Sequence, residues 1–298
     1  MNKKICSQLG ELFQNSQQIL PKPDEPFDGV LSSEIVNNIL SLQNIPITQL
    51  QIILLSVAAS YHISPISNYA VGAIVLGQSG KIYFGSNIEF VHTGLQFTIH
   101  AEQCAIINAT QHMEKGIKSI TVNAPPCGFC RQFINEIKGA EDIEFIVAGN
   151  KPKKFKSYLP DAFSGKDLSV DVDILNSSLL NYQFVDQNVD DNELFGAALA
   201  AANRSYSPYS RSVSGVAFRM SNDKIIAGSY HESAAFNPTV TAIQSAIIRA
   251  RLDGFLLKDI RDVVFLQNSN NCCDYSRITT EILNSITPDA MLTIGLIY

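Results

Sequence analysis

His100-Ala101-Glu102 and Pro126-Cys127-Gly128-Phe129-Cys130 are the two segments of this sequence that together hold a set of metal-ligating side chains. They supply one imidazole, two thiols and one further carboxylate. Three nitrogen and sulfur ligands leave one position of a tetrahedral zinc ion open, which is typical of catalytic zinc sites. A carboxylate beside that position can carry protons to and from a metal-bound water. The sequence therefore predicts one catalytic Zn²⁺ per chain, bound by His100, Cys127 and Cys130, with Glu102 as the proton carrier.

Both segments are expected at the beginning of helices. Cys127 and Cys130 are spaced so that, in a first helical turn, the two sulfurs face the same side. A helix N-terminus carries partial positive charge, which lowers the pKa of a thiol. If His100 opens a second helix, then Glu102 in its first turn can flank a metal lying ahead of the helix end.

Two other interpretations of these four residues remain. All four could bind the metal in a closed structural site, although carboxylates are less common than Cys and His in such sites. Alternatively, the imidazole and the thiols could be buried core groups, but Pro-Cys-Gly-x-Cys is a costly way to fill a core.

The chain also contains a second, diverged copy of its central region. Ser64-Pro65-Ile66-Ser67 matches Ser207-Pro208-Tyr209-Ser210, and Gly85-Ser86 matches Gly228-Ser229 at the same offset. Such a run of matches indicates a duplicated domain. The stretch that begins at His100 matches the one that begins at Thr241 after a two-residue shift.

The second copy has lost the metal-ligating residues. Thr241 stands in place of His100, and Ile243 in place of Glu102. Cys272 and Cys273 are adjacent, and neighbouring thiols are expected to lack the reach and register of a C-x-x-C clamp. Only the first copy is therefore predicted to bind zinc.

Apolar periodicity and turn residues predict alternating helices and strands, and hence an α/β fold: a three-layer α/β/α domain, duplicated, after a small N-terminal helical segment. Ser32-Ser33-Glu34 is a helix start signal inside that segment. Further helices are expected over 49–61, 100–113 and 127–137, and strands over 69–76, 81–85, 117–123 and 143–148. The expected domains are the helical segment 1–48, a catalytic domain 49–150, an extended linker 151–188 and a non-catalytic copy 189–298.

The composition disfavours several classes of partner. The net charge of -6 and the pI of about 5.4 argue against binding to nucleic acid, whose affinity comes mainly from clustered Lys and Arg. No apolar run approaches the roughly 20 residues of a transmembrane helix, and Met1–Cys6 is not followed by the apolar stretch of a signal peptide. Six cysteines are too few for a disulfide scaffold, so we expect a cytoplasmic protein without a membrane partner.

The H-x-E and P-C-x-x-C spacing is the signature of zinc nucleobase deaminases. Over nearly its whole length the chain resembles the cytidine deaminases of the large, two-copy type. Asn87-Ile88-Glu89 after a strand is the most telling match, because that family uses this Asn and Glu to hold the ribose hydroxyls. The other matching segments are Ser64–Ser67, Tyr83–Phe90, His100–Gln103, Pro126–Phe133, Tyr158–Phe163, Ala201–Ser205 and Ala234–Pro238.

The resemblance implies zinc-dependent hydrolysis of cytidine and 2′-deoxycytidine to the uridines with release of ammonia, a reaction of pyrimidine salvage. It implies that Glu102 moves protons from water to N3 of the base and to the departing amine. Asn87 and Glu89 would hold the ribose, since alternate residues of a strand point to the same side. It also implies a homodimer.

Three aromatic residues complete the site that the resemblance implies. Tyr69 stands where the family has an aromatic residue near the base, and its hydroxyl needs a partner if it is buried. Phe163 and Phe236 would press on the nucleoside, in their own or the partner's active site. For these two Phe, plain core packing is an equally good interpretation.

Two other functions compete with this one. A polynucleotide cytosine deaminase would share the zinc chemistry, but the acidic composition and the absence of a basic groove count against it. A catalytically inactive zinc-binding module is the second alternative. The intact Glu102 argues against it, since the second copy shows that an idle site loses this residue.

Overall fold

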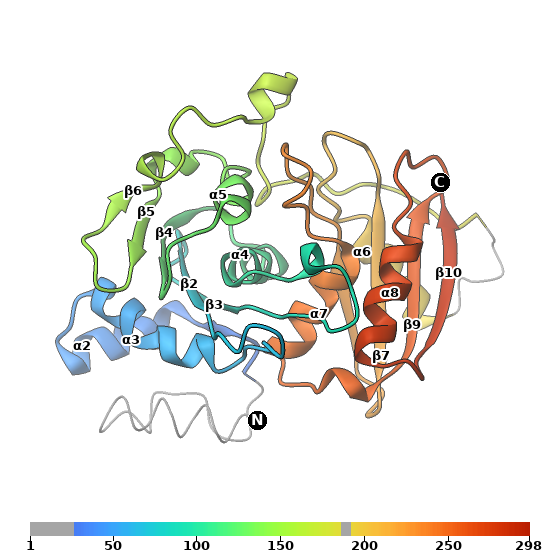
Figure 1. The fold of residues 1–298 in the computed structure, drawn as a ribbon, viewed down its shortest axis with the longest axis horizontal. Helices are drawn as coiled ribbons and strands as arrows, with labels where there is room; N and C mark the ends of the chain where they lie inside the picture. The colour runs from blue at the N-terminus through green and yellow to red at the C-terminus, as the bar shows by residue number, and fades with distance from the viewer. Residues whose placement is uncertain (1–26, 186–191) are drawn as a thin grey trace. The chain divides into compact units, whose positions relative to one another are not determined.

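The computed structural model describes residues 27–185 and 192–298, and these form two compact units (Figure 1). The described residues of the first unit are 27–89, 99–162 and 252–254. Those of the second are 90–98, 163–185, 192–251 and 255–298. The parts of the sequence-based predictions that fall on residues 1–26 and 186–191 lie outside the described residues.

The first unit is built on a six-stranded sheet with the order β1-β3-β2-β4-β5-β6. Neighbouring strands are antiparallel except β4 and β5, which are parallel. All six residues of the central strand β2 are buried, as expected for a strand covered on both faces. The elements are β1 (Val30–Leu31), α2 (Ser33–Gln43), α3 (Ile47–Ala59), β2 (Gly72–Gly77), β3 (Ile82–Ser86), α4 (Ala101–Gln111), β4 (Ile117–Val122), α5 (Gly128–Ile134), β5 (Glu144–Val147) and β6 (Lys153–Lys154).

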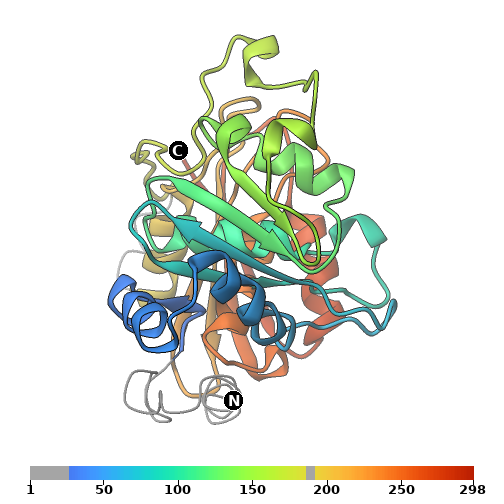
Figure 2. The same ribbon diagram turned by 90° about the vertical axis from the view of Figure 1, so that its left-hand side faces the viewer.

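Two glycines show that α3 and α4 cover opposite faces of this sheet. A Cβ atom on Gly72 would run into the backbone of α3, and one on Gly85 into the backbone of α4 at Ala101 and Ala105. Gly85 pairs with Ala73, the neighbour of Gly72 in β2, and neighbouring strand residues face opposite ways. The helix α5 packs against α4, so it lies on the α4 side. Figure 2 shows α2 and α3, in blue, over the other face.

The second unit repeats this design. Its sheet has the order β10-β9-β7-β8, which matches β5-β4-β2-β3 of the first unit, and the β9–β10 pair is again the parallel one. Both sheets have a bulge at the equivalent place, Leu76/Gly77 and Arg219/Met220. The duplicated α/β/α fold is therefore confirmed. The elements are α6 (Glu193–Ala202), β7 (Ser214–Met220), β8 (Ile225–Ser229), α7 (Ala242–Leu252), β9 (Ile260–Asn268), α8 (Ser276–Ile286) and β10 (Met291–Ile297).

The predicted helix start at Ser32 is confirmed, and the secondary structure just before it is corrected. Ser32 caps α2 by accepting a hydrogen bond from the Ile35 amide (3.3 Å), as the start signal predicts. The prediction that residues 1–48 are helical is wrong at Val30–Leu31, which pair with β3 because the Gly29 carbonyl accepts from Phe84 N (2.9 Å). The first sheet continues past residue 150 through β6. The domain boundaries themselves stay predictions.

One short segment of the first copy belongs to the second unit. Phe90–Thr98 leaves the first unit directly after Glu89. Two side chains of the second unit hold it: Gln244 Nε2 donates to the Phe97 carbonyl (2.8 Å), and Glu281 Oε1 accepts from Gly94 N (3.3 Å). The sequence does not predict that this segment belongs to the second unit, because both contacts join residues far apart in the chain.

Substituting Gly85 by alanine is expected to destabilise the protein by about 1–3 kcal/mol, because the new methyl group must push the backbone of α4 off the sheet. Gly196→Ala is the matched control. Gly196 is exposed in α6 with no atom near its Cβ position, so alanine there should stabilise by about 0.5–1 kcal/mol. Thermal unfolding measures both, and equal effects would contradict the close approach of α4 to β3.

His231 takes the place of Ile88 in the second unit. Both residues bridge two neighbouring segments in the same pattern, Ile88 to Ile63 and Ile99, and His231 to Tyr206 and Val240. His231 is buried, and its Nδ1 lies 3.0 Å from the Ser229 carbonyl. Burial lowers the pKa of its imidazole to about 4.

This histidine predicts a loss of stability in mild acid. Between about pH 6.5 and pH 4 the His231 imidazole is protonated in the unfolded chain but stays neutral in the folded protein. The free energy of unfolding should therefore fall by up to about 3 kcal/mol as the pH decreases. Above pH 6.5 the histidine is neutral in both states and has no effect. His231→Ile should remove this pH dependence in denaturant titrations. An unchanged slope in the variant would contradict the prediction.

No single helix among the described residues is long and apolar enough to cross a membrane. Only α2 and α3 taken together, with a bend of 110° between them, meet the criteria of length and composition.

Candidate metal centre

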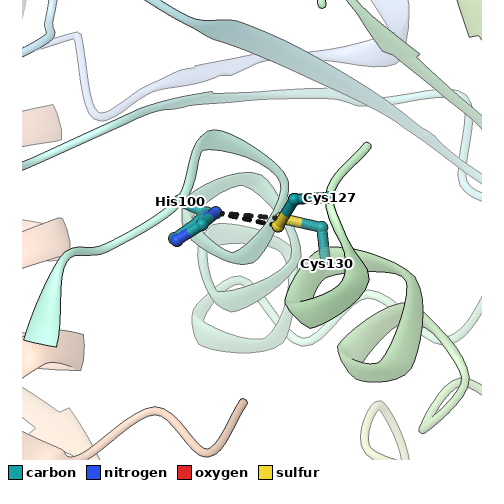
Figure 3. Close-up of side chains that lie close together, drawn as sticks. All are labelled: His100, Cys127 and Cys130. Atoms are coloured by element: carbon teal, nitrogen blue, oxygen red, sulfur yellow. Dashed lines mark hydrogen bonds between the residues drawn. The ribbon is translucent and has the colours of Figure 1, made fainter. Parts of the chain in front are cut away.

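The metal-ligating side chains lie at the starts of two helices. His100 is the N-cap residue of α4 with extended backbone (φ -87, ψ 153), and its amide donates to Gln103 Oε1 (3.2 Å). Cys127 is the N-cap residue of α5, and Cys130 lies in the first turn of that helix. Figure 3 shows the three side chains pointing toward one another. The helix starts predicted from the sequence are therefore confirmed.

The distances between the donor atoms fit one zinc ion. His100 Nδ1 lies 3.3 Å from Cys127 Sγ and 3.4 Å from Cys130 Sγ, and the two sulfurs are 3.6 Å apart. A tetrahedral zinc with Zn–S near 2.3 Å and Zn–N near 2.0 Å needs about 3.5 Å between nitrogen and sulfur and about 3.8 Å between sulfurs. The three donor atoms therefore have the spacing that a candidate zinc site requires.

The two thiols differ in the ease with which they ionise. The Cys127 and Cys130 sulfurs lie within hydrogen-bond distance of each other, and this contact together with His100 lowers the pKa of Cys127 to about 3 despite partial burial. Burial raises the pKa of Cys130 well above its usual value. Cys127 is therefore the more acidic thiol of the pair. Metal binding would require both cysteines as thiolates.

Glu102 lies beside this set without being part of it. Its side chain is buried, and burial raises the pKa of its carboxyl, although a hydrogen bond with the Cys130 thiol and the charge of His100 act against that shift. Within residues 27–185 and 192–298, the one group of metal-ligating donor atoms that lie mutually close belongs to His100, Cys127 and Cys130. A set of three ligands with a neighbouring carboxyl is the arrangement of an open site.

Asn87 and Glu89 both hold the turn that precedes β2. Glu89 accepts from the amides of Ile66 (2.9 Å) and Ser67 (3.0 Å) and from the Ser67 hydroxyl. Burial opposes ionisation of Glu89, but these three donors outweigh it and lower its pKa. Asn87 Oδ1 accepts from Val71 N (2.9 Å), and Asn87 Nδ2 donates to the Tyr69 carbonyl (3.0 Å).

The second unit has a counterpart of Glu89 but none of Asn87. Glu232 repeats the contacts of Glu89, since it accepts from the amides of Tyr209 (2.9 Å) and Ser210 (3.2 Å) and from the Ser210 hydroxyl. Asn87 has no such counterpart, because Tyr230 takes its place in the repeat. Holding the turn is therefore a task that Glu89 shares with a copy that has lost the metal ligands. The preserved match between Glu89 and Glu232 was the sequence signal for it.

The three aromatic residues are exposed. Tyr69 belongs to the first unit and is 56% exposed, so its hydroxyl needs no buried partner. Phe163 and Phe236 belong to the second unit and are 49% and 62% exposed, which disfavours the core-packing interpretation. Phe236 also has a positive φ of 60°, an uncommon conformation for a bulky residue. Strain of this kind concentrates at functional sites.

Sequence reasoning missed two side chains that position the ligands. Gln103 fixes the His100 amide, and Gln244 does the same for the Thr241 amide (2.8 Å) in the second unit. Arg131 holds the turn before Cys127, donating from Nε to the Pro126 carbonyl (2.9 Å) and from Nη1 to the Tyr158 carbonyl (3.0 Å). The signal for Gln103 was its identity with Gln244 in the repeat. Arg131 had no signal beyond its place after Cys130.

The second unit has two thiols at nearly the same separation. Cys272 Sγ and Cys273 Sγ lie 3.7 Å apart, close to the spacing of Cys127 and Cys130. The expectation that adjacent thiols lack the reach of a C-x-x-C clamp is therefore wrong for the sulfur atoms. The two copies differ in the third ligand: in the part of the chain that the structure describes, the only group of three metal-ligating side chains is the one in the first unit.

Comparison with known proteins gives the same family for both copies. Models of the cytidine and deoxycytidylate deaminase zinc-binding region match residues 48–147 and 155–280. A cytidine deaminase of Photobacterium profundum is 36% identical over 296 residues, which cover 98% of this chain and 99% of that protein. One from Vibrio cholerae serotype O1 (strain M66-2) is 38% identical over 267 residues, 90% of this chain and 89% of the relative. One from Vibrio parahaemolyticus serotype O3:K6 (strain RIMD 2210633) is 37% identical over 265 residues, 89% and 88% respectively.

Proposed function

The chain belongs to the cytidine and deoxycytidylate deaminase family, and from this we propose that it hydrolyses cytidine and 2′-deoxycytidine to the uridines with release of ammonia. The observation that carries the proposal is the fit of His100, Cys127 and Cys130 to one zinc ion with the buried Glu102 beside them. Zinc, when bound, lowers the pKa of a water so that it becomes a nucleophile near neutral pH. The residues of the chain supply the other steps.

Glu102 is the proton carrier in this proposal. A hydrolytic deamination transfers both protons of the attacking water, one to N3 of the pyrimidine and the other, from the new hydroxyl at C4, to the departing amine. Burial raises the pKa of the Glu102 carboxyl, and a carboxyl whose pKa moves closer to the working pH is a better proton carrier. Its place in the first turn of α4 fixes it relative to His100.

Asn87 and Glu89 are the ribose-holding residues in this proposal. They are two residues apart, directly after β3, and both lie on the turn Ile66–Val71. A carboxylate with a lowered pKa stays ionised and can accept from a sugar hydroxyl through oxygens that also hold backbone amides. Asn87 occurs only in the copy with the metal ligands, which supports a role at the substrate.

The exposed aromatic residues and the assembly state complete the proposal. Tyr69 contacts the base, and Phe163 and Phe236 press on a nucleoside in their own or the partner's active site; the exposure of all three leaves their rings available. The protein acts as a homodimer, in the cytoplasm, on free nucleosides in pyrimidine salvage. Sedimentation of the purified protein tests the dimer, and a mass of 32.7 kDa in solution would contradict it.

Glu89→Gln is expected to raise the KM for cytidine by about 10- to 100-fold, since a hydrogen bond to a charged group contributes about 1.5–3 kcal/mol. Glu232→Gln is the matched control, because Glu232 holds the equivalent turn of the second unit. Both variants should lower the melting temperature, but only Glu89→Gln should raise KM. Equal loss of activity toward cytidine and a ribose-lacking analogue would count against the ribose role.

The substrate class is tested by offering three substrates to the purified protein. Cytidine, 2′-deoxycytidine and a cytosine-containing single-stranded DNA are incubated with it, and the released ammonia is measured. The proposal predicts turnover of both nucleosides and none of the DNA. Turnover of the DNA alone would favour a polynucleotide deaminase, and nucleoside binding without turnover would favour an inactive zinc module.

A further inference from the structure

The loop between β9 and α8 carries a pair of adjacent thiols outside the proposed active site. Cys272 is exposed and Cys273 is half-buried, with their sulfurs 3.7 Å apart. The loop is the counterpart of the segment between β4 and α5, which ends at Cys127 and leads into the helical turn that carries Cys130. The cysteines are therefore what the second unit has at the place of the metal ligands.

The two sulfurs are far enough apart to bind one atom between them, but two ligands are too few for a zinc site. Two thiolates on one metal ion lie about 3.8 Å apart when each bond is about 2.3 Å long. Structural zinc takes four protein ligands and catalytic zinc three, and within the described residues no third metal-ligating side chain completes a group with these two. Soft thiolate ligands select soft ions. A ligand for this pair must be thiophilic and satisfied by two sulfurs.

We propose that Cys272 and Cys273 form a dithiol site for thiophilic cations of low coordination number, of which trivalent arsenic is the probe. Exposure of Cys272 gives such a cation access from solvent. The site is independent of the zinc centre and of the deaminase function proposed above.

The alternative fate of two close thiols, a disulfide, is disfavoured by the backbone. The Cα atoms of adjacent residues are about 3.8 Å apart across a trans peptide. Disulfides usually join Cα atoms about 4.4–6.8 Å apart, so a direct bond here would be strained and easily reduced. A single atom bonded to both sulfurs fits the 3.7 Å separation that they already have.

Polar neighbours prepare the pair for deprotonation. Ser212 Oγ lies 3.6 Å from Cys272 Sγ and accepts from the Cys273 amide (3.3 Å), and the Cys272 thiol donates to the Ser210 carbonyl (3.4 Å). The hydrogen bonds from Ser212 and Cys273 lower the pKa of the Cys272 thiol. A more acidic thiol, held in place by the loop Ser210–Ser212, reacts first, and its neighbour then closes the chelate.

The probe reaction is balanced by the loss of one water. With phenylarsine oxide, two arsenic–sulfur bonds form and the arsenic–oxygen bond breaks. The two thiol protons leave with that oxygen as water, and no electron changes hands. The product is a cyclic dithioarsinite, which a competing small dithiol removes by exchange and a monothiol does not.

The test is titration of the zinc-loaded protein with phenylarsine oxide, followed by intact mass and by zinc content. We expect one phenylarsenic adduct per chain with zinc unchanged, reversed by 2,3-dimercaptopropanol. Cys272→Ser and Cys273→Ser should each weaken capture by at least about 100-fold, since either leaves a monodentate thiol without the effective concentration of its neighbour. Cys104→Ser, at a buried thiol of α4, should leave capture intact.

Three results would overturn the proposal. One is an adduct that persists in both single variants. Another is capture that releases an equal amount of zinc, which would assign the arsenic to Cys127 and Cys130. The third is a protein that forms no adduct at all. Because the readouts are mass and metal content, failure of the deaminase assay has no bearing on this test.

Discussion

Glu102→Gln is expected to leave zinc bound and to reduce turnover of cytidine by at least about 100-fold, and by as much as about 10⁴-fold. Glutamine keeps the shape of the buried side chain, so the helix start that presents His100 should stay intact. It cannot give or take the protons that the reaction moves. Steady-state kinetics measure the loss, and metal analysis measures the zinc.

The two readouts separate a catalytic role from a structural one. If Glu102 were a fourth metal ligand in a closed site, the variant would lose zinc together with activity. Full turnover in the variant would remove Glu102 from the proposed mechanism altogether. Glu114→Gln is a useful control, because Glu114 is another buried carboxylate of the same unit, bonded to Tyr83 Oη (2.9 Å) and Ser79. It should lower stability without a comparable loss of turnover per folded molecule.

Cys127→Ala is expected to lose zinc and to lower the melting temperature. The thiol of Cys127 contacts both other ligands, so its removal leaves two donors for an ion that needs at least three from the protein. Metal binding contributes folding free energy, and loss of the metal removes that contribution. After dialysis against a chelator, zinc should fall to less than about a tenth of the wild-type content.

Cys272→Ser is the matched control for this prediction, because it removes an exposed thiol from the second unit and should leave zinc at one ion per chain. Undiminished zinc in Cys127→Ala would contradict the assignment of the ligands. Three of the histidines outside the set, His92, His112 and His231, should be replaceable without loss of zinc.

The metal centre was predictable from sequence because its parts are local. Cys127 and Cys130 are brought together by one helical turn, and the N-cap position of His100 follows from the helix that begins after it. The duplicated fold was predictable because the glycines that admit helices to the sheets, such as Gly85 and Gly228, recur at a constant offset. Each of these signals depends on residues close in sequence or on the repeat.

The features that sequence reasoning missed depend on long-range contacts. The segment Phe90–Thr98 belongs to the second unit through Gln244 and Glu281, which no periodicity reveals. The strand β1 is only two residues long and exists because β3 offers a free edge. The family resemblance assigned Glu89 to the ribose, and its hydrogen bonds to the Ile66–Ser67 turn were therefore not predicted.

The second copy keeps the scaffold that positions a metal centre and lacks the centre itself. Glu232 holds the same turn as Glu89, and Gln244 fixes the same helix start as Gln103. The differences are Thr241 in place of His100, Ile243 in place of Glu102, and the adjacency of the two cysteines.

We propose that zinc held by His100, Cys127 and Cys130 makes this chain a cytidine deaminase. The most direct test follows the ultraviolet absorbance of cytidine with protein that has been stripped of metal and then supplied with Zn²⁺ in steps. We expect no turnover without metal and a rise in turnover that saturates at one zinc per chain. Turnover that is unchanged in the stripped protein, or its absence from protein that holds one zinc per chain, would contradict it.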